Sequence, residues 1–235
     1  MLAVAIAITV IWMASPGRSR HTDSPRFHPT EAAGRPGNAG RPTTVATTIP
    51  PTTTTTSTDP GSLPQTMVLP PSSTPQFEAE MAALWQAVVT DSVAGAKAAF
   101  FPETAYVQLK AVADPEGDYT DRLVAGFDAD IAAAHGLLGA DAATATLVGV
   151  IVADQYGHWV PPGVCDNRIG YYEVANSRLV YRQDGQVRSF GIASLISWRG
   201  QWYVVHLGAI LRPTPGGTVE DPENGVGTVP DSTTC

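Results

Sequence analysis

The chain has 235 residues and a formal net charge of -8, with 22 acidic and 14 basic side chains. No cluster of Lys and Arg follows one face of a predicted element. Nucleic acid is therefore not expected as a partner, because phosphate neutralisation supplies most non-specific affinity. An acidic surface mainly favours solubility. Residues 77–212 hold most of the periodic apolar pattern, enough for one self-sufficient domain.

Residues 1–14 are predicted to form an apolar membrane anchor or signal segment. Leu2 to Ala14 carries no charge and is followed by the helix breakers Ser15-Pro16-Gly17. The run is shorter than the about 20 apolar residues that span a bilayer, and it lacks the basic start and cleavage site of a signal peptide. We expect the natural chain to begin upstream, so that this segment is an uncleaved single-pass anchor in the cytoplasmic membrane. Secretion and a buried core helix are the alternatives.

Residues 15–76 are predicted to be a disordered linker. Thr and Pro make up 20 of the 35 residues from Pro42 to Gln76. Such a segment buries too little apolar surface to offset about 1–2 kcal/mol of backbone entropy per residue. Dense Thr with Pro is also typical of O-glycosylated stalks. The linker would hold the domain away from the membrane, on its extracytoplasmic side.

Three helices are predicted at the start of the domain. Apolar side chains recur at helical spacing from Phe77 to about residue 100. A short second helix is expected over residues 106–112, and Asp114-Pro115-Glu116-Gly117 is taken as a break. The third helix, capped by Asp118 or Thr120, runs to Leu138.

Strands are predicted for the rest of the domain. Asp184-Gly185 and Arg199-Gly200 predict two hairpins, which pair Gln183 with Gln186 and Trp198 with Gln201. One face of these strands is apolar and should receive the helices: Leu179, Phe190, Ile192, Ile196, Tyr203, Val205 and Leu207. The opposite face is mixed and suits a partner, a second layer or solvent: Val180, Gly191, Ala193, Leu195, Ser197, Trp202, Val204 and His206. The predicted class is α+β, with three N-terminal helices packed on a curved antiparallel sheet.

The two cysteines lie 70 residues apart, Cys165 in a loop and Cys235 at the last position. An extracytoplasmic location favours a disulfide between them, which would tie the Gly/Pro-rich tail, residues 213–235, back to the domain. Free thiols and an intermolecular bond are the alternatives. Two cysteines at this spacing make no metal site, and no metal or cofactor is expected.

No nucleophile, metal or nucleotide-binding motif occurs in the sequence. The candidate pocket residues are Tyr106, His135, Tyr172 and His206. A helix histidine such as His135, beside Ile131 and Leu138, is more typical of a packing residue, whereas His206 is expected near Ala193, whose small side chain would leave space. Asp128 and Asp130 are expected on the solvated side of the third helix. A separate candidate interaction surface, built from an aromatic and proline loop with a tryptophan of the sheet, consists of Tyr156, His158, Trp159 and Trp202. That loop is also consistent with a lid packed on the sheet.

The order of the elements and the final hairpin, SLISWRGQWYVVHLG, resemble the nuclear transport factor two-like superfamily. The resemblance covers about residues 77–208. It implies a cone-shaped α+β fold with a pocket between helices and sheet, and it brings no catalytic residue. The segments FFPETAYVQLKAV and WVPPGVCDNRIGYYEV also resemble uncharacterised actinobacterial membrane-anchored cell-envelope proteins.

These observations favour an extracytoplasmic, membrane-anchored binding or interaction module of the cell envelope without catalytic activity. Its expected partners are the membrane, through the N-terminal segment, and an envelope protein or cell-wall component. The alternative is a small-molecule-binding or hydrolase-like enzyme that uses a pocket between the helices and the sheet. A structural wall spacer is a third possibility.

Overall fold

The computed structural model of the chain describes residues 59–208 and 216–230. All of these residues lie in one compact unit. The predicted anchor, residues 1–14, lies outside the described residues, as do Cys235 and most of the predicted linker.

The first helix, α1 (Pro75–Thr90), begins where Thr74 caps it, with the Thr74 hydroxyl accepting a hydrogen bond from the Phe77 N–H at 3.1 Å. It ends earlier than predicted, because Asp91 adopts a left-handed conformation with φ 50°. Such a residue interrupts the helical hydrogen-bond pattern. A 3-10 segment, η2 (Val93–Ala98), follows. The second helix, α2 (Glu103–Leu109), begins after Pro102.

A long helical run replaces the predicted third helix. It comprises α3 (Pro115–Asp118), the π-helical segment η3 (Tyr119–Val124), α4 (Ala125–Leu138) and the 3-10 segment η4 (Gly139–Thr144). The sequence at Asp114-Pro115 starts this run instead of breaking it. The Asp114 carboxylate accepts a hydrogen bond from the Gly117 N–H at 3.0 Å, and proline is well suited to the first helical position.

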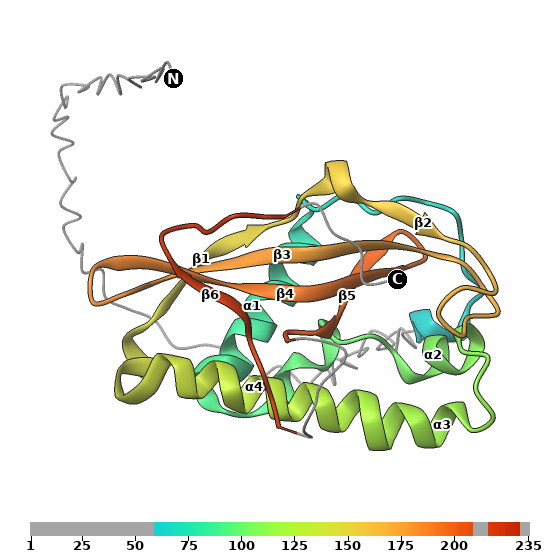
Figure 1. The fold of residues 1–235 in the computed structure, drawn as a ribbon, viewed down its shortest axis with the longest axis horizontal. Helices are drawn as coiled ribbons and strands as arrows, with labels where there is room; N and C mark the ends of the chain where they lie inside the picture. The colour runs from blue at the N-terminus through green and yellow to red at the C-terminus, as the bar shows by residue number, and fades with distance from the viewer. Residues whose placement is uncertain (1–58, 209–215, 231–235) are drawn as a thin grey trace, which may run out of the picture. The chain divides into compact units, whose positions relative to one another are not determined.

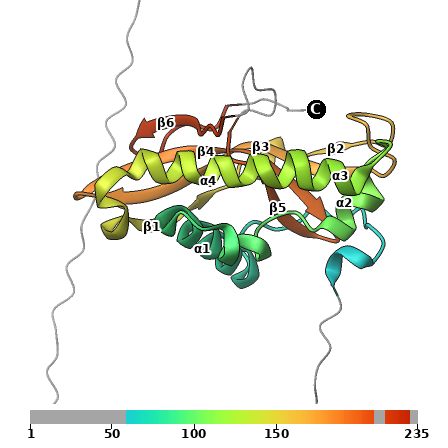
Figure 2. The ribbon, with the colours of Figure 1, turned by 90° about the horizontal axis from the view of Figure 1, so that it is seen from below.

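The strands form an antiparallel sheet, which confirms the α+β class. They are β1 (Thr146–Ile151), β2 (His158–Val160), β3 (Tyr171–Gln183), β4 (Gln186–Trp198), β5 (Gln201–His206) and β6 (Glu220–Asn224). The central order is β1-β3-β4-β5, while β2 pairs with β3 and β6 pairs with β4. Figures 1 and 2 show α1 and the α3–α4 run on one side of this sheet.

By length and composition, Pro115–Thr144 is the only described helical run that passes a test for crossing a membrane. The core helix of a globular domain passes the same test, and this run packs on the sheet through buried side chains such as Phe127 and Ile131.

Both predicted hairpin turns are present. Asp184 and Arg199 have φ values of 51° and 53°, and each is followed by a glycine with positive φ. The predicted pairs of Gln183 with Gln186 and Trp198 with Gln201 are confirmed. One irregularity changes the end of β5: a bulge shifts the register, so His206 lies opposite Ser194 and not near Ala193 as predicted.

The mixed face of the sheet is buried by chain segments that were assigned to the linker and the tail. Trp202 on this face is 1% exposed. The Gln65 side chain donates a hydrogen bond to the Ser197 carbonyl at 2.8 Å. Near β6, the Arg178 guanidinium lies against Gly227. The folded region therefore extends beyond residues 77–212, to Asp59 at one end and into the predicted tail at the other.

Asp130 joins the helical layer to the C-terminal return and does not lie on a solvated face as predicted. It is 0% exposed. Its Oδ2 accepts hydrogen bonds from the Leu207 and Gly208 N–H groups, both at 3.2 Å. Its Oδ1 accepts one from the Thr218 N–H at 2.9 Å. One carboxylate thus connects α4 to the segments that follow β5 and precede β6.

We expect Asp130→Asn to lower the free energy of unfolding by about 3 kcal/mol, because an amide supplies one acceptor oxygen where the carboxylate supplies two. Urea denaturation measures this change. The matched control is Asp128→Asn on the same helix, which is exposed and should change stability by no more than about 0.5 kcal/mol. Equal effects of the two substitutions would contradict the assigned role.

Candidate functional site

The π-helical segment η3 separates two cavities. Arg122 and Leu123 line a polar cavity between α2 and the sheet. Tyr119, Thr120 and Val124 line a second cavity against η2 and the start of α2. π-helical turns are rare and are frequently found at functional sites, because the extra residue in the turn redirects neighbouring side chains. Here one short segment supplies residues to both cavities.

The polar cavity has a volume of about 90 Å³. Most of its side chains come from α2, η3 and the strands β3, β4 and β5, and several of them are polar although buried. The lining residues are Tyr106, Leu109, Lys110, Arg122, Leu123, Asn167, Tyr171, Glu173, Ser194, Ile196, Val205 and His206.

A buried carboxylate forms the floor of the polar cavity. Glu173 on β3 is 1% exposed. The Ser194 hydroxyl donates a hydrogen bond to Glu173 Oε1 at 3.1 Å, and His158 Nε2 lies 3.6 Å from Oε2. His206, which the β5 bulge places opposite Ser194, also lines the cavity. This set of groups is able to bind a polar ligand or exchange protons with one.

Charged and phenolic groups surround the other end of the polar cavity. The Arg122 Nε and a terminal nitrogen each donate a hydrogen bond of 2.7 Å to the Asp118 carboxylate. Arg122 also contacts the Tyr106 hydroxyl at 2.5 Å, and that hydroxyl donates to Asp118. The hydrogen bonds from Arg122 hold the pKa of Asp118 below its usual value, whereas burial and the hydrogen bond to Asp118 raise the pKa of Tyr106.

Burial also shifts the pKa of two further groups that line the polar cavity, Lys110 and Tyr171. Burial is the main cause that lowers the pKa of Lys110, whose ammonium donates a hydrogen bond to the Cys165 carbonyl at 2.8 Å. Burial, together with the Glu173 carboxylate, raises the pKa of Tyr171 to about 12. Asn167 is 1% exposed, and its Oδ1 has no hydrogen-bond partner in the described part of the chain. Such an oxygen is available to a ligand or to water.

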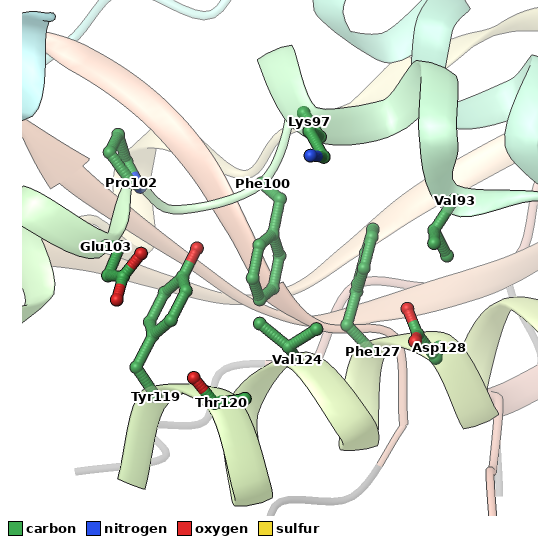
Figure 3. A pocket seen from close by; sticks show the side chains of 10 residues that line it. All are labelled: Val93, Lys97, Phe100, Pro102, Glu103, Tyr119, Thr120, Val124, Phe127 and Asp128. Atoms are coloured by element: carbon green, nitrogen blue, oxygen red, sulfur yellow. The ribbon is translucent and has the colours of Figure 1, made fainter. Parts of the chain in front are cut away.

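The second cavity is an aromatic groove of about 440 Å³ (Figure 3). Phe100 stacks on Phe127 with ring centroids 4.3 Å apart, and Tyr119 lies 5.9 Å from Phe100. The remaining lining residues are Val93, Lys97, Pro102, Glu103, Thr120, Val124 and Asp128. Lys97, Glu103 and Asp128 form no ion pair with one another or with other described residues. The groove thus combines an apolar floor with unpaired charges around it.

Only two of the four predicted pocket residues lie together. Tyr106 and His206 both line the polar cavity. His135 instead contacts the Val88 carbonyl through Nδ1 at 2.9 Å, which links α4 to α1. Tyr172 lies outside the lining of the polar cavity and packs against Trp159, with ring centroids 5.0 Å apart.

The predicted interaction surface is not one exposed loop. His158 and Trp159 belong to strand β2, where they pair with Glu173 and Tyr172. Trp202 is buried, so its ring is not presented to a partner on the surface of the domain. Tyr156 is half-buried in the 3-10 segment η5 (Asp154–Tyr156).

Cys165 lies in the turn before β3 with φ 52°. Its proposed partner, Cys235, is outside the described residues, so the disulfide stays a prediction. Within residues 59–208 and 216–230, no group of three or more His, Cys, Asp or Glu side chains is arranged to hold a metal ion.

Sequence reasoning missed Glu173, Ser194, Lys110 and the Arg122–Asp118 pair. Glu173 carried a usable signal, because it is the only charged residue in the apolar run Tyr171 to Ala175. A single charged residue on a predicted buried strand indicates either that the strand is wrongly predicted or that the residue belongs to a functional site, because charged side chains are rarely fully buried. Asp118 and Arg122 also stand at the helical spacing that favours an ion pair.

The ion pair of Asp118 should make stability depend on pH. Because the pKa of Asp118 is lowered in the folded state, its contribution is complete above the unfolded pKa of about 3.9 and is lost as pH falls through the folded pKa. We expect Asp118→Asn to lower the free energy of unfolding by roughly 1 kcal/mol at pH 7, with the difference shrinking below about pH 4. Urea denaturation across this pH range measures it. Asp121→Asn, at an exposed position on the same helical run, is the control; an equal pH-dependent difference there would contradict the assignment.

No family model, curated protein or solved structure matches this chain.

Proposed function

We propose that this protein is a binding module that holds the apolar part of a partner in the aromatic groove, displayed outside the cytoplasmic membrane. The observation that carries the proposal is the groove of about 440 Å³, whose floor includes the rings of Phe100, Tyr119 and Phe127. Pockets of roughly 300–1,000 Å³ with mainly apolar walls and a few polar groups are typical ligand sites. Aromatic side chains also supply much of the affinity at protein interfaces.

The proposed location of the module, outside the cytoplasmic membrane, is based on the N-terminal sequence. An apolar segment followed by a Thr/Pro-rich stretch supports an anchored domain that reaches a partner in the envelope. A sheet covered on one side by helices, with a cavity between them, is compatible with the nuclear transport factor two-like fold, and we propose that relationship on the residues quoted for the resemblance. The proposed partner is an envelope protein or a cell-wall component.

Filling the groove tests the binding function. Thr120 and Ala125 are both exposed on the same helical run, but only Thr120 lines the groove. We expect Thr120→Trp to weaken saturable binding of the apolar dye bis-anilinonaphthalene sulfonate at least tenfold, because the indole occupies the space of the ligand. The control, Ala125→Trp, should bind as the wild type does.

The same two positions test whether a partner uses the groove. A photoreactive residue at position 120 should yield a discrete crosslinked product in intact cells, and one at position 125 should not. Equal dye binding by the two tryptophan variants, together with the absence of any crosslink specific to position 120, would refute the proposal.

Topology is tested with protease added to cells from which the wall has been removed. We expect the domain to be degraded while a cytoplasmic marker protein stays intact, since the anchor places the domain outside. Degradation only after lysis would place the domain inside the cell and contradict the extracytoplasmic location.

A second candidate is a small-molecule or hydrolase-like enzyme that uses the polar cavity. The observation that favours it is Glu173, a buried carboxylate with His158 and Ser194 beside it. Turnover of small p-nitrophenyl esters that is abolished in Glu173→Gln but retained in Thr120→Trp would establish this candidate. Absence of turnover across the ester panel would leave the groove as the functional site.

A further inference from the structure

A third cavity, of about 250 Å³, lies where the start of α1 meets the turn between β4 and β5. We call it the Trp202 cavity. Its walls combine prolines and aromatic rings with amide, carboxylate and guanidinium groups: Pro71, Thr74, Pro75, Gln76, Phe77, Glu80, Arg199, Gly200, Gln201 and Trp202. None of these residues lines the aromatic groove or the polar cavity.

A chain of side-chain hydrogen bonds follows the wall of the Trp202 cavity. The Tyr203 hydroxyl donates to Gln201 Oε1 at 2.8 Å. Gln201 Nε2 donates to Gln76 Oε1 at 3.1 Å, and Gln76 Nε2 donates to Glu80 Oε1 at 3.0 Å. Each donor points the same way, towards the Glu80 carboxylate. The chain fixes the orientation of both amides, and such networks rigidify the groups that they connect.

The two most buried polar groups of the cavity are incompletely satisfied. Glu80 is 7% exposed, and no described residue donates a hydrogen bond to its Oε2 or forms an ion pair with it. Burial also raises the pKa of Glu80. Trp202 is 1% exposed, and its Nε1–H has no hydrogen-bond partner among the described residues. A buried polar group left without a partner costs about 1–3 kcal/mol, so the Trp202 N–H would gain from a ligand, whereas Glu80 Oε2 is an acceptor that keeps some access to solvent.

The required ligand must accept a hydrogen bond from the indole and donate one to the carboxylate. A cation would satisfy Glu80 but leave the Trp202 N–H unpaired, and the Arg199 guanidinium that lines the cavity would repel it. An anion would be repelled by Glu80. A hydroxyl group both donates and accepts, so a neutral ring carrying several hydroxyls matches both atoms and the two amides. Its apolar ring face fits the walls made by Phe77 and the prolines.

We propose that the Trp202 cavity is a carbohydrate-binding site that takes one sugar ring, either a free monosaccharide or the end of a glycan. This site is independent of the aromatic groove, because the two share no lining residue. A negative result for one of the two proposed sites therefore does not bear on the other.

The test uses the full 235-residue chain in a detergent without a sugar headgroup. The probes are glucose, galactose and N-acetylglucosamine, with butylammonium and acetate as charged comparisons. NMR follows the indole N–H signal of Trp202 and the side-chain amide signals of Gln76 and Gln201. We expect at least one sugar to shift the indole signal in a saturable way and the charged probes to leave it unchanged.

Two matched substitutions on α1 make the test specific. Glu80→Gln keeps the shape of the side chain and should weaken sugar binding at least tenfold. Glu78→Gln removes the same charge from an exposed position outside the cavity and should leave the affinity unchanged. Trp202→Phe removes the indole donor together with part of the ring system and should also weaken binding, with circular dichroism to confirm folding.

The proposal is overturned if none of the three sugars shifts the Trp202 signal up to high millimolar concentration, or if Glu80→Gln binds sugar as tightly as the wild type. A saturable shift with butylammonium but not with sugar would overturn it as well, because it would make the cavity a cation site. If an O-linked chain of the stalk occupies the cavity in place of a free sugar, deglycosylation should abolish its effect on the Trp202 indole signal. Addition of the glycopeptide should then restore that effect.

Discussion

Two turns of two residues each fix how the three central strands pair. In both turns the first residue, Asp184 or Arg199, and the glycine after it have positive φ, the geometry that suits the twist of antiparallel strands. The register that results decides which side chains share a face, because successive residues of a strand point to opposite sides. It directs Glu173 and Ser194 towards the polar cavity. The Arg199-Gly200 turn itself lines the Trp202 cavity, so the hairpin that sets the register also shapes a candidate site.

Burial of the second face of the sheet explains why the folded region is longer than residues 77–212, the range predicted from the apolar pattern. Chain segments rich in Thr and Pro do not order by themselves, yet here Gln65 donates a hydrogen bond to a backbone carbonyl of the sheet, that of Ser197. The same holds for β6, whose sequence EDPEN lacks the β-branched and aromatic residues typical of strands. Asp130 fixes the chain just before it. Amino-acid composition predicts whether an isolated segment is ordered. These segments are ordered by contacts with neighbouring parts of the domain, which composition does not describe.

The sequence predicted best those features that a few adjacent residues determine. Both hairpin turns, their register and the α+β class came from such signals. The candidate sites did not, because they depend on distant residues and on local irregularities. A bulge in β5 moves His206 opposite Ser194, and the π-helical turn aims Arg122 and Tyr119 to different sides. Neither irregularity has a distinct residue pattern. Tyr106 and His206 line one cavity, whereas His135 and Tyr172 make packing contacts with Val88 and Trp159.

Two buried carboxylates show how a structural group is distinguished from a binding group in this protein. Asp130 and Glu80 both lie on helices and are almost inaccessible, at 0% and 7% exposed. Asp130 has backbone donors on both oxygens, so the fold itself satisfies it. Glu80 has one donor, on one oxygen, and borders a cavity that also contains the unpaired Trp202 N–H. Because the unpaired Trp202 N–H is a buried group that lowers stability, its retention at a cavity wall beside Glu80 is better explained by a ligand than by packing.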